Sequence, residues 1–254
     1  MSFKKVLFVC LSLVLVGGIL TGCGKKSSPP PGSVEADEAR GIKFSADKKT
    51  LVKYNKNLPD KEYVIPDGVT TIRPGAFYGC KNLTNVTIPP SMTRIDNGAF
   101  AGCGLTSVTI PASVTKIGES AFARCKNLTS VTIPASVTTI GEGAFGDCKN
   151  LKSVTIPEGV TTIYFYAFDG CHNLTSVTIP SSVTTIGDRA FRDCKNLKSV
   201  TILEGVTHIG SSAFEGCESL TEVTIPASVK TIGYGAFAGC PCEESVKKQF
   251  PNYW

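Results

Sequence analysis

The stretch that decides the fold is residues 110–132, which read IPASVTKIGESAFARCKNLTSVT. The same pattern occurs eight times, with a spacing of 23 residues everywhere except for one spacing of 22, where a residue is missing between Cys103 and Leu105. The first isoleucines of the copies are Ile65, Ile88, Ile110, Ile133, Ile156, Ile179, Ile202 and Ile225. A period this regular predicts a solenoid of stacked coils.

Within one copy, alternating apolar and polar residues predict a short strand. Val131 and Ile133 are apolar and Thr132 between them is polar, which is the period of a strand with one buried face. We therefore expect Thr132 to point outward. Pro134 has no backbone N–H, so the parallel ladder of hydrogen bonds should stop there.

The rest of the copy predicts a return across the core. Val137 and Ile140 lead the chain back, and Gly141 is expected to permit a tight change of direction. Four further apolar residues are spaced to share one side of a helical or 3-10 turn; they are Ala144, Phe145, Cys148 and Leu151. One strand and one turn cannot bury these side chains alone, so stability has to come from neighbouring coils.

The first residues predict export. Lys4 and Lys5 precede 15 mainly apolar residues at 6–20, whereas a membrane-spanning helix needs roughly 20. We assign residues 1–22 to a signal peptide. Residues 23–34, rich in Lys, Ser, Pro and Gly, are expected to form a flexible tether. Residues 35–64 are expected to be an N-terminal cap, 65–242 the eight repeats, and 243–254 a C-terminal cap or tail.

The repeat resembles the Treponema-type, or BspA-like, leucine-rich repeat in its L-x-x-V-x-I run and its A-F-x-x-C turn. The resemblance implies an α/β repeat solenoid, right-handed and curved, with a parallel β-sheet of short strands and short helical or 3-10 turns. It also implies a bacterial surface protein that adheres to host matrix or cell-surface proteins, to glycans or to other cells. It supplies no consensus ligand residues. Departures from the repeat are Arg73, Asp96 and Tyr164 for glycine, Met92 for valine and Leu203 for proline.

Residues 20–23, Leu-Thr-Gly-Cys, resemble the lipobox of bacterial lipoproteins. The resemblance implies cleavage before Cys23, acylation of this cysteine, and lipid anchoring in the cell envelope, with the outer membrane or the cell surface as the expected address. The alternative is a secretory signal that ends beside a cysteine by chance.

Eight cysteines occupy one repeat position, from Cys80 to Cys240. They could form a buried ladder whose sulfurs face backbone groups, disulfides between neighbouring coils, or a metal array. We favour the buried ladder, because no histidine or acid recurs at ligand spacing, and we expect no metal or cofactor. Cys240 and Cys242 could still oxidise at the open end. The two histidines, His172 and His208, occupy different repeat positions, so we expect no enzyme.

The net charge of +5 falls to about +3 once Lys4 and Lys5 are removed, so nucleic acid is not an expected partner. Binding by the outward side chains of the strands is the favoured function. These are Asn85, Thr87, Ser107, Thr109, Ser130, Thr132, Ser153, Thr155, Ser176, Thr178, Ser199, Thr201, Glu222 and Thr224. They predict two hydroxyl columns that a protein or a glycan could contact.

Two other interpretations of the hydroxyl columns stay open. Serine and threonine are also what a merely solvated strand uses. An ice-binding array is disfavoured, because Glu222, Lys152 and Lys198 break the regularity. A second candidate contact is the aromatic triplet Tyr164, Phe165 and Tyr166 in the fifth copy. A non-adhesive scaffold that binds another envelope component is the alternative function.

Overall fold

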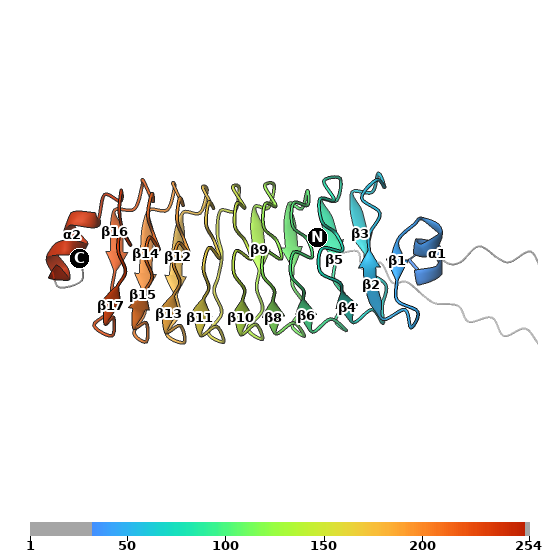
Figure 1. Ribbon diagram of the computed structural model, residues 1–254, viewed down its shortest axis with the longest axis horizontal. Helices are drawn as coiled ribbons and strands as arrows, with labels where there is room; N and C mark the ends of the chain where they lie inside the picture. The colour runs from blue at the N-terminus through green and yellow to red at the C-terminus, as the bar shows by residue number, and fades with distance from the viewer. Residues whose placement is uncertain (1–31, 252–254) are drawn as a thin grey trace, which may run out of the picture.

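The computed structural model describes residues 32–251. They form a parallel-strand β-solenoid of about eight turns, stacked in one row with a short helix at each end (Figure 1). The predicted signal peptide, Cys23 and most of the predicted tether lie outside the described residues. Within them, no helix is both long and apolar enough to cross a bilayer.

Most coils carry two strands, where the sequence predicted one. The front strands are β3 (Glu62–Val64), β5 (Asn85–Thr87), β7 (Ser107–Thr109), β9 (Ser130–Thr132), β12 (Ser176–Ile179), β14 (Ser199–Ile202) and β16 (Glu222–Thr224). All of them except β3 contain predicted outward residues. The second strands are β4 (Thr71–Ile72), β6 (Arg94–Ile95), β8 (Lys116–Ile117), β10 (Thr139–Ile140), β11 (Thr162–Ile163), β13 (Thr185–Ile186), β15 (His208–Ile209) and β17 (Thr231–Ile232). Two residues are too few to show a strand period, which is why the second strands were missed.

The second strands from β6 to β17 form one continuous parallel sheet, in the order β17-β15-β13-β11-β10-β8-β6. The front strands do not. Their hydrogen-bond ladder is divided into β3-β5, β7-β9 and β12-β14-β16. The first interruption falls at the 22-residue copy. The second falls at residues 153–157, which make only an isolated bridge between Ser130 and Ser153. The front strands are therefore parallel, as expected, but their ladder is interrupted at two places.

Proline does end the front ladder, as predicted. In the copies that have it, the strand stops before the proline, and Val137 N–H donates to the Pro134 carbonyl in a turn. Where Leu203 replaces proline, its N–H donates to the Ile179 carbonyl of the preceding coil at 3.0 Å. The ladder thus extends by one bond at the one copy where the donor is restored.

The A-F-x-x-C segment is not helical, which corrects the predicted helical or 3-10 turn. Its N–H groups alternate between two kinds of partner: Ala144 N–H donates to Gly141 within the coil, and Phe145 N–H donates to Ala167 of the next coil. Gly143 and Asp147 have φ of 58° and 57°, a left-handed conformation that interrupts a helix. Among residues 32–251 the α-helices are α1 (Val34–Ala39) and α2 (Glu243–Gln249), so the fold is a β-solenoid with little helix rather than α/β.

Gly141 serves a different purpose from the predicted one. It is not left-handed; instead, a Cβ at this residue would lie 2.8 Å from Glu119 N and from Gly118 C of the preceding coil. Glycine is therefore required because two coils approach closely, and the left-handed turn that needs conformational freedom lies at Gly143.

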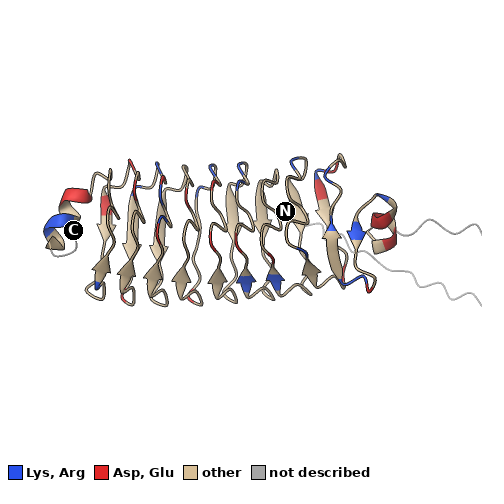
Figure 2. Cartoon of the chain, viewed as in Figure 1, with Lys and Arg blue, Asp and Glu red and all other residues tan. Residues whose placement is uncertain are grey.

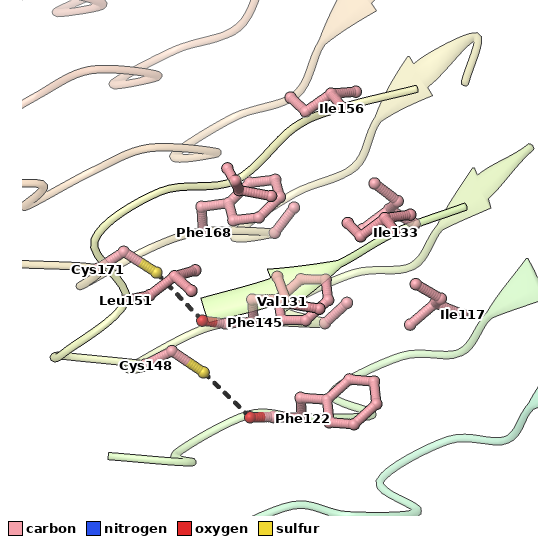
Figure 3. Packing of buried hydrophobic residues seen from close by; sticks show 14 of the residues in the cluster. Ile117, Phe122, Val131, Ile133, Phe145, Cys148, Leu151, Ile156, Phe168 and Cys171 are labelled. Atoms are coloured by element: carbon pink, nitrogen blue, oxygen red, sulfur yellow. Dashed lines mark hydrogen bonds between the residues drawn. The ribbon is translucent and has the colours of Figure 1, made fainter. Parts of the chain in front are cut away.

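The core is a stack of identical positions. The eight phenylalanine rings from Phe77 to Phe237 lie face to face, with centroids 4.9–5.5 Å apart and all rings fully buried. Figure 3 shows three of them, Phe122, Phe145 and Phe168. Leucine, valine and isoleucine of each coil surround the stack. Because every ring touches the next coil, burial is shared between neighbours, as expected for a solenoid.

Different elements cover the two ends of the stack. At the N-terminal end, β1 (Lys43–Phe44) pairs antiparallel with β2 (Thr50–Lys53), which pairs parallel with β4. The Tyr54 ring stacks on Phe77 at 5.1 Å and so continues the aromatic column. The buried Asp37 of α1 accepts a hydrogen bond from the Tyr63 hydroxyl at 2.6 Å. At the other end, α2 buries Val246 against the last coil.

Candidate binding surface

The front strands present the predicted columns to solvent. Twelve of the fourteen predicted strand residues are exposed, and Ser199 and Thr201 are half-buried. Their apolar neighbours, such as Val86 and Val131, point into the core. The alternation that predicted an outward face is therefore confirmed, although the interrupted ladder divides the columns into three parts.

The front hydroxyls differ from other hydroxyls of the repeat in their hydrogen bonds. Threonines one position before a front strand donate to the carbonyl of the same position in the preceding coil; they are Thr84, Thr106, Thr129 and Thr175, at 3.0–3.4 Å. By contrast, within residues 32–251 the side chains of the outward serines and threonines on the front strands form no hydrogen bond. The first group stabilises the stack, and the second is available to a ligand.

Each interruption of the front ladder is hollowed. Residues of β5 and β7 line a hollow of about 410 Å³ together with Pro90 and Pro111. Residues 153–158 and β12 line a second hollow of about 510 Å³, with Pro180 and Leu203 at its rim. The hydroxyls of Ser153, Thr155, Ser176 and Thr178 lie beside apolar groups in this second hollow, which is the composition of a shallow binding site. Sequence reasoning did not find the hollows; the only signals were the short copy and the proline replaced by Leu203.

Charged groups lie mainly outside the outward positions of the front strands (Figure 2). Arg94 and Lys116 are aligned on β6 and β8 of the second sheet. Lys152 and Lys198 precede the front residues of their coils and line a third hollow, of about 500 Å³, with Thr175, Asn173 and Asn196. The front face is thus polar and mostly uncharged, with two lysines at one margin.

The aromatic triplet is placed apart from the hydroxyl columns. It follows β11 of the second sheet, and none of its residues lines the front hollows. Tyr164 and Phe165 are 44% and 49% exposed, as expected for a triplet that cannot all point inward. Tyr166 is left-handed, with φ of 57°, and its ring lies 5.6 Å from the guanidinium carbon of Arg189, which also donates to its hydroxyl. Tyr166 is therefore held by its neighbour, and Tyr164 and Phe165 are the accessible members.

The cysteines form a buried ladder with sulfurs on backbone carbonyls. Seven thiols donate to the phenylalanine carbonyl of the preceding coil at 3.0–3.4 Å, among them Cys148 to Phe122 and Cys171 to Phe145 (Figure 3). All nine described cysteines are free, including Cys240 and Cys242. The ladder geometry matches the favoured interpretation, since each thiol links two coils.

Burial makes these thiols poor nucleophiles. Desolvation raises the pKa of Cys125 to about 12 and that of Cys148 well above its usual range. The exception is Cys80, whose pKa is lowered by the neighbouring Cys103, although its side chain is buried. His208 lies on β15 beside Thr231, and His172 is half-buried. Within residues 32–251, no group of three or more His, Cys, Asp or Glu side chains could hold a metal ion.

Comparison with known proteins agrees with the repeat pattern and the coils. The model of the BspA type leucine rich repeat region matches residues 54–164 and 115–244, in six copies. The chain belongs to the BspA-type leucine-rich repeat family. No curated protein sequence matches it.

Solved structures of bacterial leucine-rich repeat proteins are similar to this BspA-type chain. The leucine rich repeat protein of Treponema pallidum shares 29% identity with a TM-score of 0.58, over 84% of this chain and 94% of that one. A leucine-rich repeat protein of Eubacterium ventriosum shares 27% identity with a TM-score of 0.53, over 78% and 64%. A leucine rich cell surface protein of Faecalibacterium prausnitzii shares 29% identity with a TM-score of 0.39, over 66% and 61%. The chain thus spans 61% of the Faecalibacterium protein.

Proposed function

We propose that this BspA-type protein is a bacterial surface adhesin that binds a protein or a glycan through its front face. The observation that supports the proposal most directly is that some hydroxyls form hydrogen bonds between coils and others form none. Threonines such as Thr129 and Thr175 are used between coils, whereas the outward hydroxyls of the front strands have no partner among residues 32–251. Polar groups on a rigid scaffold that form no hydrogen bonds within the protein are available to hydrogen-bond a ligand.

Binding rather than catalysis is supported by the chemistry of the buried groups. The ladder thiols are desolvated and, apart from Cys80, held in the neutral form. Among residues 32–251 His172 forms no side-chain hydrogen bond, and His208 bonds to the exposed Thr231 hydroxyl with no carboxylate to orient its imidazole. A nucleophilic site needs an activated thiolate or hydroxyl, a base within reach, and a third group that orients the base, so we place the function on the surface.

Surface exposure is the second part of the proposal. It is supported by the predicted signal peptide and by the lipobox-like residues that end at Cys23. An acylated Cys23 would anchor the chain in a membrane, and residues 24–34 would hold the repeats away from it. The right hand and the curvature implied by the resemblance belong to the proposal too. Small-angle X-ray scattering of the full chain would measure the curvature.

Variants on two coils test the use of the front face. Thr155→Glu with Thr178→Glu places two carboxylates on the front face, and Thr162→Glu with Thr185→Glu places the same groups on the second strands of the same coils. Immobilised matrix proteins and glycans serve as probes. We expect the front variant to lose at least about tenfold in affinity and the control to stay within about twofold. If the front variant and the control bind every probe that the wild type binds with equal affinity, the front face is not the binding surface.

Protease treatment of intact cells separates the adhesin from the scaffold alternative. Loss of the repeat region from the cell fraction requires exposure to the outside, and full protection would favour a periplasm-facing scaffold. A periplasmic protein released by osmotic shock serves as the control for cell integrity. A scaffold would bind another envelope component, which crosslinking in intact cells followed by mass spectrometry would identify.

A further inference from the structure

A hollow lined by two lysines adjoins the front face. Lys152 and Lys198 flank Thr175 in three successive coils, and the hollow has a volume of about 500 Å³. These three residues and two asparagines, Asn173 and Asn196, line the hollow, and we name the five residues together the lysine cradle. Because neighbouring coils are about 4.8 Å apart, the two lysines start roughly 10 Å from each other along the solenoid. This separation is comparable with one disaccharide unit of an extended polysaccharide.

The two cradle lysines are not neutralised. Both are exposed, and among residues 32–251 no carboxylate lies within ion-pair distance of either. Neighbouring cations are different: Lys195 pairs with Glu218 and Arg192 with Asp169, each at 2.9 Å. Since unpaired cations at the edge of a hollow attract anions, the cradle favours a negatively charged ligand.

The cradle also offers oriented amides. Asn196 Nδ2 donates to Asn173 Oδ1 at 2.9 Å, and Asn173 Nδ2 donates to Asn150 Oδ1 at 3.0 Å. One N–H of each amide is thereby used and the other is left for a ligand. The Thr175 hydroxyl donates to the Lys152 carbonyl and keeps its lone pairs as acceptors. The cradle thus combines two cations with neutral donors and acceptors.

The cradle continues into the hollow of the front face. Ser153 follows Lys152 directly, and Ser176 follows Thr175; both line the 510 Å³ hollow with Thr155 and Thr178. No aromatic residue or arginine lines either hollow. Such residues are the usual anchors of protein interfaces. Cations beside a row of free hydroxyls therefore fit a sugar chain with acidic groups better than a folded protein.

We propose that the lysine cradle and the adjoining front hollow bind an acidic polysaccharide. Its sulfate or carboxylate group lies between Lys152 and Lys198, and its hydroxyls bond the front serines and threonines. This inference rests on the proposed function, because it names the ligand class of the same face. Two carboxylates limit where the acidic groups can lie: Glu222, which pairs in register with Ser199 one coil further on, and Glu158, which lines the 510 Å³ hollow. The acidic groups are therefore placed at the two lysines, and only the hydroxyls of the sugar extend into the hollow.

The test uses the full chain in a mild non-ionic detergent and three immobilised probes: heparin, which is sulfated, hyaluronan, which is carboxylated, and neutral dextran. Lys152→Gln with Lys198→Gln removes the cradle charges. Lys116→Gln with Lys230→Gln removes the same charge elsewhere and is the matched control. We expect the cradle variant to bind an acidic glycan about tenfold more weakly and the control to stay within about twofold. Binding should weaken as salt rises, and the better of the two acidic probes distinguishes sulfate from carboxylate.

Three results would overturn the inference: no binding of either acidic glycan by the wild type, equal losses in both lysine variants, or equal binding of dextran. Double-stranded DNA is a fourth probe, and equally tight DNA binding lost with the same substitutions would reject a glycan as the ligand. Immobilised matrix proteins in the same assay separate the two proposals. If Thr155→Glu with Thr178→Glu abolishes binding of a matrix protein, the cradle variant does not, and neither acidic glycan binds, the proposed function holds and the inference fails.

Discussion

The aromatic column predicts how the free energy of unfolding depends on position along the solenoid. Phe145 is fully buried and its ring stacks on two others, Phe122 at 5.4 Å and Phe168 at 5.5 Å. Phe145→Ala should therefore cost about 3–5 kcal/mol from lost burial and the cavity left behind. Phe237 is equally buried but stacks on one ring, Phe214. Phe237→Ala should cost less by about 0.5–1.5 kcal/mol, which is the contribution of one stacked pair.

Urea unfolding of the full chain, followed by circular dichroism, measures both variants. Because coils stabilise only their neighbours, Phe145→Ala should also weaken the coupling between the two halves and broaden the transition. Phe237→Ala should instead loosen the last coil first and leave the main transition sharp. A loss below about 1 kcal/mol for Phe145→Ala, or an equal loss for both variants, would contradict a core built from shared rings.

Three shorter predictions follow from the turns, the thiols and the N-terminal end. Gly141→Ala should destabilise the chain by about 1–3 kcal/mol, because its Cβ would lie 2.8 Å from the backbone of the preceding coil. Urea unfolding measures the loss, and an unchanged midpoint would show that the two coils are not so close. The pKa of Cys125 is raised to about 12 in the folded state, so its stabilising contribution is complete below the unfolded pKa of about 8.5 and is lost as pH rises toward 12. The free energy of unfolding should thus fall between about pH 8.5 and pH 12, and Ellman's reagent should react with Cys125 only after unfolding. Tyr63→Phe leaves the buried Asp37 without its 2.6 Å hydrogen bond and should lower the thermal midpoint, with a cost of about 1–3 kcal/mol; no shift would show that water replaces the hydroxyl.

The stacking of coils could be predicted from the sequence because the same pattern of apolar residues recurs in eight copies. Phe145 and Cys148 have an identical residue in all eight copies and Val131 in the seven copies that extend so far, and such positions have to face the one environment that every coil shares. Pro134 could also be interpreted from the sequence, because a residue without an N–H cannot donate a hydrogen bond to the neighbouring strand and so ends the ladder. Leu203 has the N–H that proline lacks, and there the ladder extends by one hydrogen bond.

The turn conformations could not be predicted in the same way. The spacing of Ala144, Phe145 and Cys148 fits a helical turn, but a helix needs each N–H to bond within the segment. Here alternate N–H groups bond to the next coil instead, as Phe145 does to Ala167. This partner lies 22 residues away in the sequence, so local apolar spacing carries no sign of it. The role of Gly141 was hidden for the same reason, since its crowding comes from another coil.

The candidate site was predictable only as a set of outward positions. Alternation in the front strands gave the exposed hydroxyls, but it could not distinguish Thr132, which is free, from Thr129, which bonds to Thr106 of the preceding coil. That distinction depends on which carbonyl lies beside each hydroxyl once the coils are stacked. The hollows are equally non-local, because each needs two adjacent coils whose strands do not pair.

This division explains how such a solenoid can change its ligand without changing its fold. Residues that contact the next coil, among them Phe145, Cys148 and Thr129, are constrained by that neighbour and cannot vary alone. The outward serines and threonines of the front strands form no side-chain hydrogen bond within residues 32–251, so we expect their substitution to alter recognition at little cost in stability. Lys152 and Lys198 take the place that threonine holds in the other copies, and each replaces a hydroxyl by a cation that has no ion-pair partner among residues 32–251. Recognition in this chain is therefore expected to reside where the repeat is least regular, at coils in which a stacking residue has been replaced by one that faces solvent.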